Sequence, residues 1–260
     1  MKIFILGGKG FIGSAFARFC ERNGKECRII DLDNYEENKG KACGLFINAD
    51  GNSKKFLAAE NPLEDFRLSV VSLLHSLRDF RFDRYVYISS VDVYPDCSTP
   101  ATTVEDISLP SGRQSNYGFH KLLGELMIKH YAPEWIIVRL GGILGPGLTK
   151  NPVFDLLHDR PLRVNEESKY QYLPSDFVAE TVFGLTGMNR WREVFNICGK
   201  GTVALREIRS WLNKPLRYFG QSLPREKYDV NIEKISRLFE VPESRDVARE
   251  FVLSEAEKST

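Results

Sequence analysis

Three side chains of this sequence have the types and spacing needed to exchange a proton with a substrate oxygen. Tyr117 and Lys121 are four residues apart and follow Ser115-Asn116, so on a helix they lie on one face. An ammonium group beside a phenol lowers the phenol's pKa from about 10, which allows the tyrosine to exchange a proton near neutral pH. Ser90 follows the apolar run 85–88, where its hydroxyl can hold a substrate oxygen against the tyrosine. We therefore expect Ser90, Tyr117 and Lys121 to be catalytic.

A glycine-rich segment near the N-terminus has the spacing of a turn that binds a pyrophosphate. Gly7 permits a tight turn, Gly10 lets backbone N–H groups approach a phosphate, and Gly13 lets the following helix pack on the sheet. Asp31 ends the second predicted strand, 18 residues after Gly13. A carboxylate at this place accepts both hydroxyls of an adenosine ribose and repels a 2′-phosphate, so the sequence favours NAD over NADP.

Short apolar runs alternate with helical patterns and predict the elements that position these residues. Continuous apolar strands separated by helices are typical of a parallel sheet covered on both faces, so we predict a Rossmann-type, doubly wound α/β fold. A long surface loop is expected at 95–115. The predicted strands are 3–6, 27–30, 45–47, 85–88, 135–138 and 194–197, and the predicted helices are 14–23, 64–78, 117–130, 154–158, 176–188, 205–212 and 232–239.

The length of 260 residues favours one core with a small appended lobe. We expect an NAD-binding Rossmann domain at 1–150, to which 176–200 partly returns. The remaining chain, 151–260, would form a small C-terminal substrate lobe.

Composition excludes several classes of protein. The chain carries 36 basic and 35 acidic residues, which gives no electrostatic basis for binding nucleic acid or an anionic membrane. Its apolar runs are far shorter than the roughly 18 residues of a membrane helix, and the N-terminus lacks the roughly 7 to 15 apolar residues of a signal peptide. Five cysteines without a CxxC motif indicate a cytoplasmic protein, and four histidines without ligand spacing predict no metal site.

Taken together, these motifs resemble the extended short-chain dehydrogenase/reductases, the NAD-dependent epimerase/dehydratase family. The resemblance implies bound NAD and hydride transfer, most often on a nucleotide-activated sugar. It also implies a homodimer formed through helices 64–78 and 117–130. The segments that carry it cover nearly the whole chain: 7–13, Asp31, 89–94, 117–121, 138–146, 175–178, 195–196 and 229–242.

The resemblance also implies roles for individual residues. Tyr117 would be the acid/base, Lys121 would lower its pKa and hold the nicotinamide ribose, and Ser90 would orient the substrate oxygen. The residues expected to bind NAD are Gly7, Gly10, Phe11, Ile12, Gly13, Asp31, Asn48, Ala49 and Lys121, and those expected near the substrate are Asp92, Tyr94, Gly142, Asn151 and Lys169.

The pattern departs from the family between the second and third predicted strands. Only 13 residues, 32–44, lie there, too few for a helix, a strand and a return. We therefore predict that the family's third strand and its preceding helix are absent. The lost strand is an edge strand, so the sheet survives while the adenine pocket loses a wall, for which Asp33 and Asn34 can compensate.

Single positions depart from the family as well. Asp50 stands where small apolar residues are usual, and a carboxylate there either favours a nicotinamide cation or points to water. Gly142 stands where an asparagine often holds a nucleotide sugar, and Lys169 replaces an arginine that often meets a phosphate. Val91 fills the first place of the acidic pair found in dehydratases, and Asp92 fills the second.

These observations favour an NAD-dependent epimerase or reductase acting on a sugar, with a nucleotide-linked sugar as the expected form. Two alternatives stay open. The truncated adenine side and Asp50 fit a catalytically idle dinucleotide-binding module, whereas Gly142 and the short lobe fit a reductase of a smaller carbonyl compound.

Overall fold

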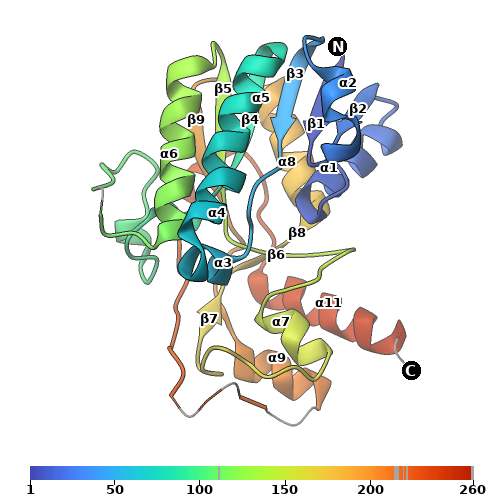
Figure 1. Cartoon of the computed structure of the whole chain (residues 1–260). Coiled ribbons are helices and arrows are strands. Elements are labelled where there is room, and N and C mark those ends of the chain that lie inside the picture. The colour runs from blue at the N-terminus through green and yellow to red at the C-terminus, as the bar shows by residue number, and fades with distance from the viewer. Residues whose placement is uncertain (111, 214–216, 219, 221, 259–260) are drawn as a thin grey trace. The chain divides into compact units, whose positions relative to one another are not determined.

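The computed structural model describes residues 1–110, 112–213, 217–218, 220 and 222–258. The chain forms two compact units, and each is described by itself (Figure 1). Unit 1 comprises Met1–Pro95, Glu105–Leu140 and Asp176–Phe195, and unit 2 comprises Asp96–Val104, Gly141–Ser175 and Asn196–Thr260.

A six-stranded sheet in the order β2-β1-β3-β4-β5-β9 forms the centre of unit 1. Every pairing from β2 to β5 is parallel. The predicted doubly wound fold is thus confirmed. The strands are β1 (Ile3–Leu6), β2 (Cys27–Ile30), β3 (Ala42–Asn48), β4 (Arg81–Ser90), β5 (Trp135–Leu140) and β9 (Glu193–Ile197).

The predicted loss of the family's third strand is also confirmed. Strand β2 pairs with β1 alone and forms the edge of the sheet, while β1 pairs on its other side with β3, with Ile3 opposite Leu45. The connection from β2 to β3 holds a 3-10 turn, Leu32–Asn34, and one turn of helix, α2 (Tyr35–Asn38). This turn is fixed to the sheet because Tyr35 packs against Phe80 and donates a hydrogen bond to Asp79 over 3.1 Å.

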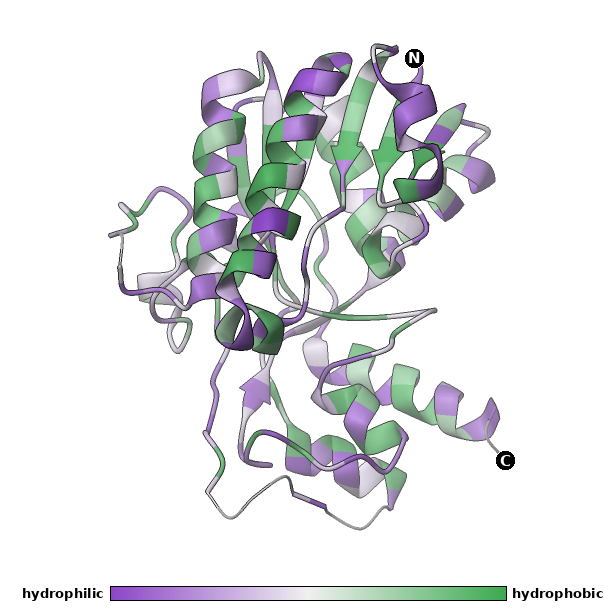
Figure 2. Cartoon of the chain, in the orientation of Figure 1, coloured by the Kyte–Doolittle hydropathy of each residue, from purple (hydrophilic) through white to green (hydrophobic). Residues whose placement is uncertain are grey.

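Helices cover both faces of the sheet (Figure 1). One face carries α5 and α6, which bury Leu73, Leu77 and Ile128 against Phe4 and Phe46. Burying each such side chain contributes about 1.5–3 kcal/mol, which is why these apolar runs form the core. Figure 2 shows the hydrophobic strands between helices of mixed hydropathy. The helices of unit 1 are α1 (Phe11–Arg22), α3 (Lys55–Glu60), α4 (Pro62–Phe66), a π-helical turn (Arg67–Val71), α5 (Ser72–Asp79), α6 (Asn116–Tyr131) and α8 (Ser175–Gly187).

Unit 2 has two small sheets and its own apolar core. Strands β6 (Gly142–Leu144) and β8 (Tyr172–Pro174) are parallel, and β7 (Lys169–Tyr170) and β10 (Val203–Ala204) are antiparallel. Its helices are α7 (Pro152–Leu157), α9 (Leu205–Leu212), α10 (Glu233–Ser236) and α11 (Ser244–Lys258). The predicted helix 232–239 is reduced to the four residues of α10. Helix α11, which the sequence analysis missed, buries Val247, Ala248 and Val252 in this core.

Candidate active site

Helix α6 presents Tyr117 and Lys121 on its buried face. The helix starts where the Ser115 hydroxyl accepts a hydrogen bond from the Gly118 N–H over 3.2 Å, as the sequence indicates. Gly118 lets the helix approach the main chain of Asp92 so closely that a Cβ there has no room. Tyr117 is therefore held next to the end of β4, with 8% of its surface exposed.

Ser90 lies at the carboxyl end of β4, beside the phenol of Tyr117. The Ser90 hydroxyl donates to an Asp92 carboxylate oxygen over 2.9 Å, and the other carboxylate oxygen pairs with the Lys55 ammonium at 2.7 Å. Lys55 was not among the predicted site residues, because only the fold brings the start of α3 to Asp92. The structure thus adds a cation to the predicted group of Ser90, Asp92 and Tyr117.

The charges and burial around Tyr117 act on its phenol in opposite directions. Burial, followed by the Asp92 carboxylate, raises the pKa of Tyr117 above its usual value of 10. The Lys55 ammonium and a hydrogen bond with Ser90 act to lower that pKa. The sequence analysis expects the lowering cation to be Lys121, whereas in the ligand-free chain Lys55 has this effect and burial outweighs it.

Lys121 occupies an unusually buried place for an ammonium group. Only 5% of its surface is exposed, and its Nζ donates to the Ile88 carbonyl over 3.2 Å and lies 5.4 Å from the centre of the Tyr87 ring. Burial lowers the pKa of Lys121 to about 8, against the opposing fields of the Asp50, Asp65 and Glu125 carboxylates. A lysine that titrates near neutral pH is suited to a part in proton exchange.

A buried Asp65–His120 pair flanks the catalytic helix. Asp65 on α4 is fully buried, and its carboxylate lies 2.6 Å from His120 Nδ1, one residue before Lys121. The second oxygen of Asp65 accepts from Asn52 over 2.7 Å and from Ser69 over 3.3 Å. The sequence offered no signal for this pair, because 55 residues separate its members and His120 alone is an ordinary core histidine.

Tyr94, which the sequence analysis assigns to substrate, belongs to a different buried network. It is 3% exposed, and its hydroxyl accepts a hydrogen bond from Arg139 over 2.7 Å. Arg139 in turn makes a two-pronged ion pair with Glu125, which also accepts from Ser89 over 2.7 Å. The expectation for Tyr94 is therefore wrong, since its hydroxyl serves this network, which ties α6 to β4 and β5.

The glycine turn has the shape that the sequence predicts. Gly7 has a φ of 73°, and its N–H donates to the Ile30 carbonyl over 2.8 Å. A Cβ on Gly13 would collide with the main chain of Gly7 and Gly8, so the turn needs glycine there. Gly10 caps α1 without a side-chain hydrogen bond, which leaves the N–H groups of Phe11, Ile12 and Gly13 at the helix start. Such an end attracts a phosphate.

Asp31 supplies the second half of a dinucleotide site. One carboxylate oxygen accepts weakly from the Lys9 N–H at 3.4 Å, and the other is buried without a hydrogen-bond partner among the described residues. An unpartnered buried carboxylate oxygen is costly unless a ligand satisfies it, and ribose hydroxyls are suitable donors. Asp31 and the glycine turn therefore fit NAD.

The residues expected to replace the lost adenine wall are engaged in local structure. Asp33 pairs with Lys9 at 2.8 Å. Asn34 accepts from the Asp31 N–H over 3.0 Å and donates to the Ile29 carbonyl over 3.1 Å. Asn34 thereby fixes the backbone of Asp31, and Asp33 neutralises a cation beside it.

Asn48 and Ala49 lead from the end of β3 into this region. The Asn48 side chain donates to the Tyr85 hydroxyl over 2.8 Å, inside the sheet core. The predicted cofactor contact of Asn48 is thus wrong for its side chain. Ala49 and Asp50 lie against the glycine turn, since a Cβ on Gly7 would be 3.0–3.1 Å from their main chain.

The remaining residues predicted near the substrate belong to unit 2. A Cβ on Gly142 would lie 2.6 Å from the Gln171 carbonyl and 2.7 Å from the Tyr172 ring, so the family's asparagine has no room here. Asn151 caps α7 by accepting from the Phe154 N–H over 2.9 Å. Lys169 lies in β7 opposite Ala204.

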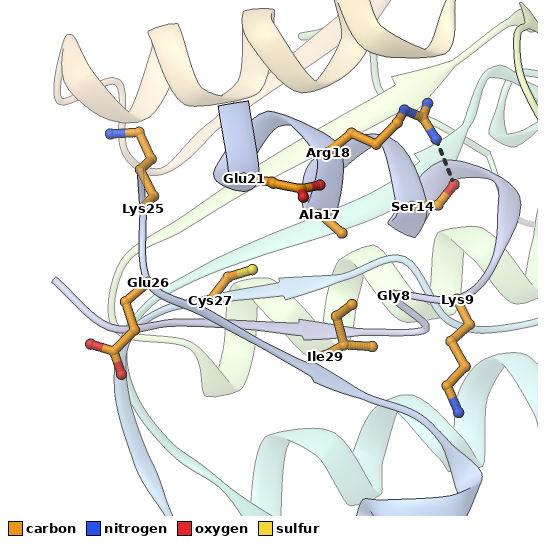
Figure 3. Close-up of a pocket in the computed structure, with 10 residues that line it drawn as sticks. All are labelled: Gly8, Lys9, Ser14, Ala17, Arg18, Glu21, Lys25, Glu26, Cys27 and Ile29. Carbon is orange, nitrogen blue, oxygen red and sulfur yellow. Dashed lines mark hydrogen bonds between the residues drawn. The ribbon is translucent and has the colours of Figure 1, made fainter. Parts of the chain in front are cut away.

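A hollow of about 720 Å³ lies between α1 and β2 (Figure 3). It holds none of the predicted catalytic residues, and it touches the glycine turn through Gly8 and Lys9. Ser14, Ala17, Arg18 and Glu21 line its α1 side, and Cys27 and Ile29 line its β2 side. The hollow lies beside the edge strand, where the helix preceding the missing third strand would otherwise cover this face.

Comparisons with solved structures show the fold. A UDP-galactose 4-epimerase matches with a TM-score of 0.82 and 19% identity, over 99% of both chains. The UDP-glucuronic acid 4-epimerase of Bacillus cereus, in complex with a UDP-sugar and NAD, matches with a TM-score of 0.79 and 15% identity over 100% of both chains. The dTDP-glucose 4,6-dehydratase of Bacillus anthracis, in complex with NAD, matches with a TM-score of 0.77 and 18% identity over 99% of this chain and 97% of that one.

Further comparisons and searches bear on class. No curated protein matches the sequence. Within the described ranges, no helix is both long enough and apolar enough to cross a bilayer. In the same part of the chain, no three potential metal ligands gather into a group that could hold an ion.

The sequence itself matches the model of one family, the NAD dependent epimerase/dehydratase family, over residues 3–158. The matched region contains the glycine turn, Asp31, Ser90 and the Tyr117–Lys121 pair, which are the residues that the structure gathers at the carboxyl edge of the sheet. The chain therefore belongs to the NAD dependent epimerase/dehydratase family, whose members are enzymes that use NAD.

Proposed function

We propose that this protein is an NAD-dependent epimerase or reductase that acts by hydride transfer on a nucleotide-linked sugar, with Tyr117 as the acid/base. The observation that carries the proposal is the hydrogen bond between Ser90 and Tyr117 beside a buried lysine that titrates near pH 8. Solved structures of the same fold that hold UDP-sugars and NAD support this substrate class.

Each residue has a defined part in the proposed reaction. Bound NAD accepts and returns the hydride at the substrate carbon. Tyr117 removes the proton from the hydroxyl on that carbon and gives it back when a carbonyl is reduced. Ser90 holds the same oxygen by a hydrogen bond, and Lys121 binds the nicotinamide ribose. The positive charge of oxidised nicotinamide opposes the effect of burial on the phenol, so cofactor binding lowers the pKa of Tyr117 toward the working range.

An epimerase or a reductase fits the site better than a dehydratase. A dehydratase needs an acid and a base beside the hydroxyl residue, and here Val91 takes one of the two places. Asp92 in the other place accepts from Ser90 and pairs with Lys55, so it positions the serine.

A reductase of a smaller carbonyl compound is the second candidate. The observation that favours it is the filled space above Gly142, where the Gln171 carbonyl and the Tyr172 ring exclude the asparagine that often holds a nucleotide sugar. A catalytically idle module is disfavoured, because it has no need of Ser90, Tyr117 and Lys121 together.

We also propose that two copies associate through α5 and α6. Leu74, Leu126 and Tyr131 on these helices are 38%, 55% and 40% exposed, an unusual number of apolar side chains for helices of a monomer. Two copies that pair these helices would bury them.

The Tyr117→Phe substitution tests the mechanism. We expect loss of turnover with UDP-, GDP- or dTDP-sugars, while the dissociation constant for NAD⁺ measured by calorimetry stays within about twofold, because the phenol oxygen is needed for proton transfer and not for cofactor binding. The readout is the change of sugar stereochemistry, or the oxidation of NADH, followed by NMR and absorbance. Retained turnover would refute the role of Tyr117, and turnover only with small carbonyl compounds would establish the second candidate.

A further inference from the structure

Asp50 is a carboxylate that the structure fixes in place beside the cofactor site. Its N–H donates to the Asn48 side chain over 2.9 Å, and one of its carboxylate oxygens accepts from the Ser72 hydroxyl of α5 over 2.6 Å. The residue is exposed, so the carboxylate is held at the surface of the site and not buried in the core.

The surroundings of Asp50 connect the two ends of the dinucleotide site. On one side, its main chain lies against the glycine turn, 3.0 Å from the position that a Cβ on Gly7 would take. On the other side, Lys121 Nζ lies 3.8 Å from the position of a Cβ on Gly51, the next residue. Among the carboxylates that act on Lys121, Asp50 raises its pKa most. Asp50 thus lies between the turn that fits the pyrophosphate and the lysine that would bind the nicotinamide ribose.

We propose that Asp50 makes this site bind oxidised NAD⁺ in preference to reduced NADH, an inference that rests on the proposed function. The two forms differ in the nicotinamide ring, which is cationic in NAD⁺ and neutral in NADH, and share the pyrophosphate and both riboses. A carboxylate near the ring attracts only the cationic form, whereas a small apolar residue does not discriminate. Asp50 is thus a specificity-determining residue for the oxidation state of the cofactor.

The preference has a consequence for the reaction. A site that favours NAD⁺ limits the build-up of reduced cofactor beside an oxidised substrate and favours return of the hydride. This property suits an enzyme that takes a hydride from a sugar and gives it back within one cycle.

Calorimetry with three ligands tests the inference. Dissociation constants for NAD⁺, NADH and ADP-ribose are measured at pH 6.5, where Lys121 is protonated, for the unmodified chain, Asp50→Asn and Asp50→Ala. Both substitutions should raise the ratio of the NAD⁺ constant to the NADH constant by about 3- to 10-fold, the effect of one charge near solvent. Glu60→Gln, which removes an exposed carboxylate from α3, is the matched control and should leave the ratio unchanged.

The three ligands separate the possible failures. If the Asp50 variants bind NAD⁺ and NADH with an unchanged ratio, the inference is overturned, and a parallel change in ADP-ribose affinity would show that Asp50 acts on the pyrophosphate instead. If the unmodified chain binds none of the three ligands, the proposed NAD site itself fails and the inference fails with it.

Discussion

Replacing Lys121 by methionine should make the ligand-free protein more stable at neutral pH, although it removes a catalytic residue. The Lys121 ammonium is 5% exposed, and burial lowers its pKa from 10.5 to about 8. A shift of this size corresponds to about 3 kcal/mol of unfavourable free energy for the charged form in the folded chain. Methionine has a similar length and no charge, so Lys121→Met should recover up to about 3 kcal/mol.

The pH dependence distinguishes this cause from better packing. Below about pH 8 Lys121 is protonated in both the folded and the unfolded chain, and its cost is fully present. Between about pH 8 and 10.5 the unfolded chain binds more protons than the folded chain, so the stability of the unmodified protein rises with pH, by about 1.4 kcal/mol per unit. Lys121→Met lacks this contribution, so its advantage should shrink to about a third by pH 9.5.

Urea unfolding of both proteins between pH 7 and 9.5 measures the difference. Lys129→Met is the control, because Lys129 is exposed on the same helix and should show the pH dependence of the unmodified protein. Other groups that titrate in this range, including the tyrosines, contribute equally to both proteins and cancel in the difference. Unfolding free energies that run parallel with pH for Lys121→Met and the unmodified chain would refute the assignment of a destabilising ammonium to Lys121.

Two further substitutions test the cofactor site and the proposed dimer. Asp31→Asn should weaken NAD⁺ binding about 10-fold in calorimetry, because the unpartnered carboxylate oxygen that would accept a ribose hydroxyl becomes a weaker acceptor or a donor; equal affinity in both proteins would contradict the ribose contact. Leu126→Glu places a charge on the 55% exposed position of α6 and should shift the protein to a monomer in sedimentation experiments; a parent chain that already sediments as a monomer would disprove the dimer.

The fold followed from the sequence because its signals are local. Apolar runs such as 3–6 and 85–88 and the amphipathic helices between them determine a parallel sheet wherever they occur. The absence of the third strand also followed, since the length of 32–44 is a matter of counting. The glycine turn was equally predictable, because Gly7 and Gly13 are needed by backbone geometry that tolerates no side chain.

The tertiary structure alone decided which polar groups meet. The sequence showed that Ser90 and Tyr117 belong to the same edge of the sheet, but not that Lys55 pairs with Asp92 beside them. It placed Tyr94 near the substrate, whereas the packing of α6 directs its hydroxyl to Arg139. A strand or helix is encoded by the periodicity of neighbouring residues, while the partner of a buried charge is set by whichever distant segment packs against it. For the same reason, the Asp65–His120 pair and the burial that lowers the pKa of Lys121 became visible only in the folded chain.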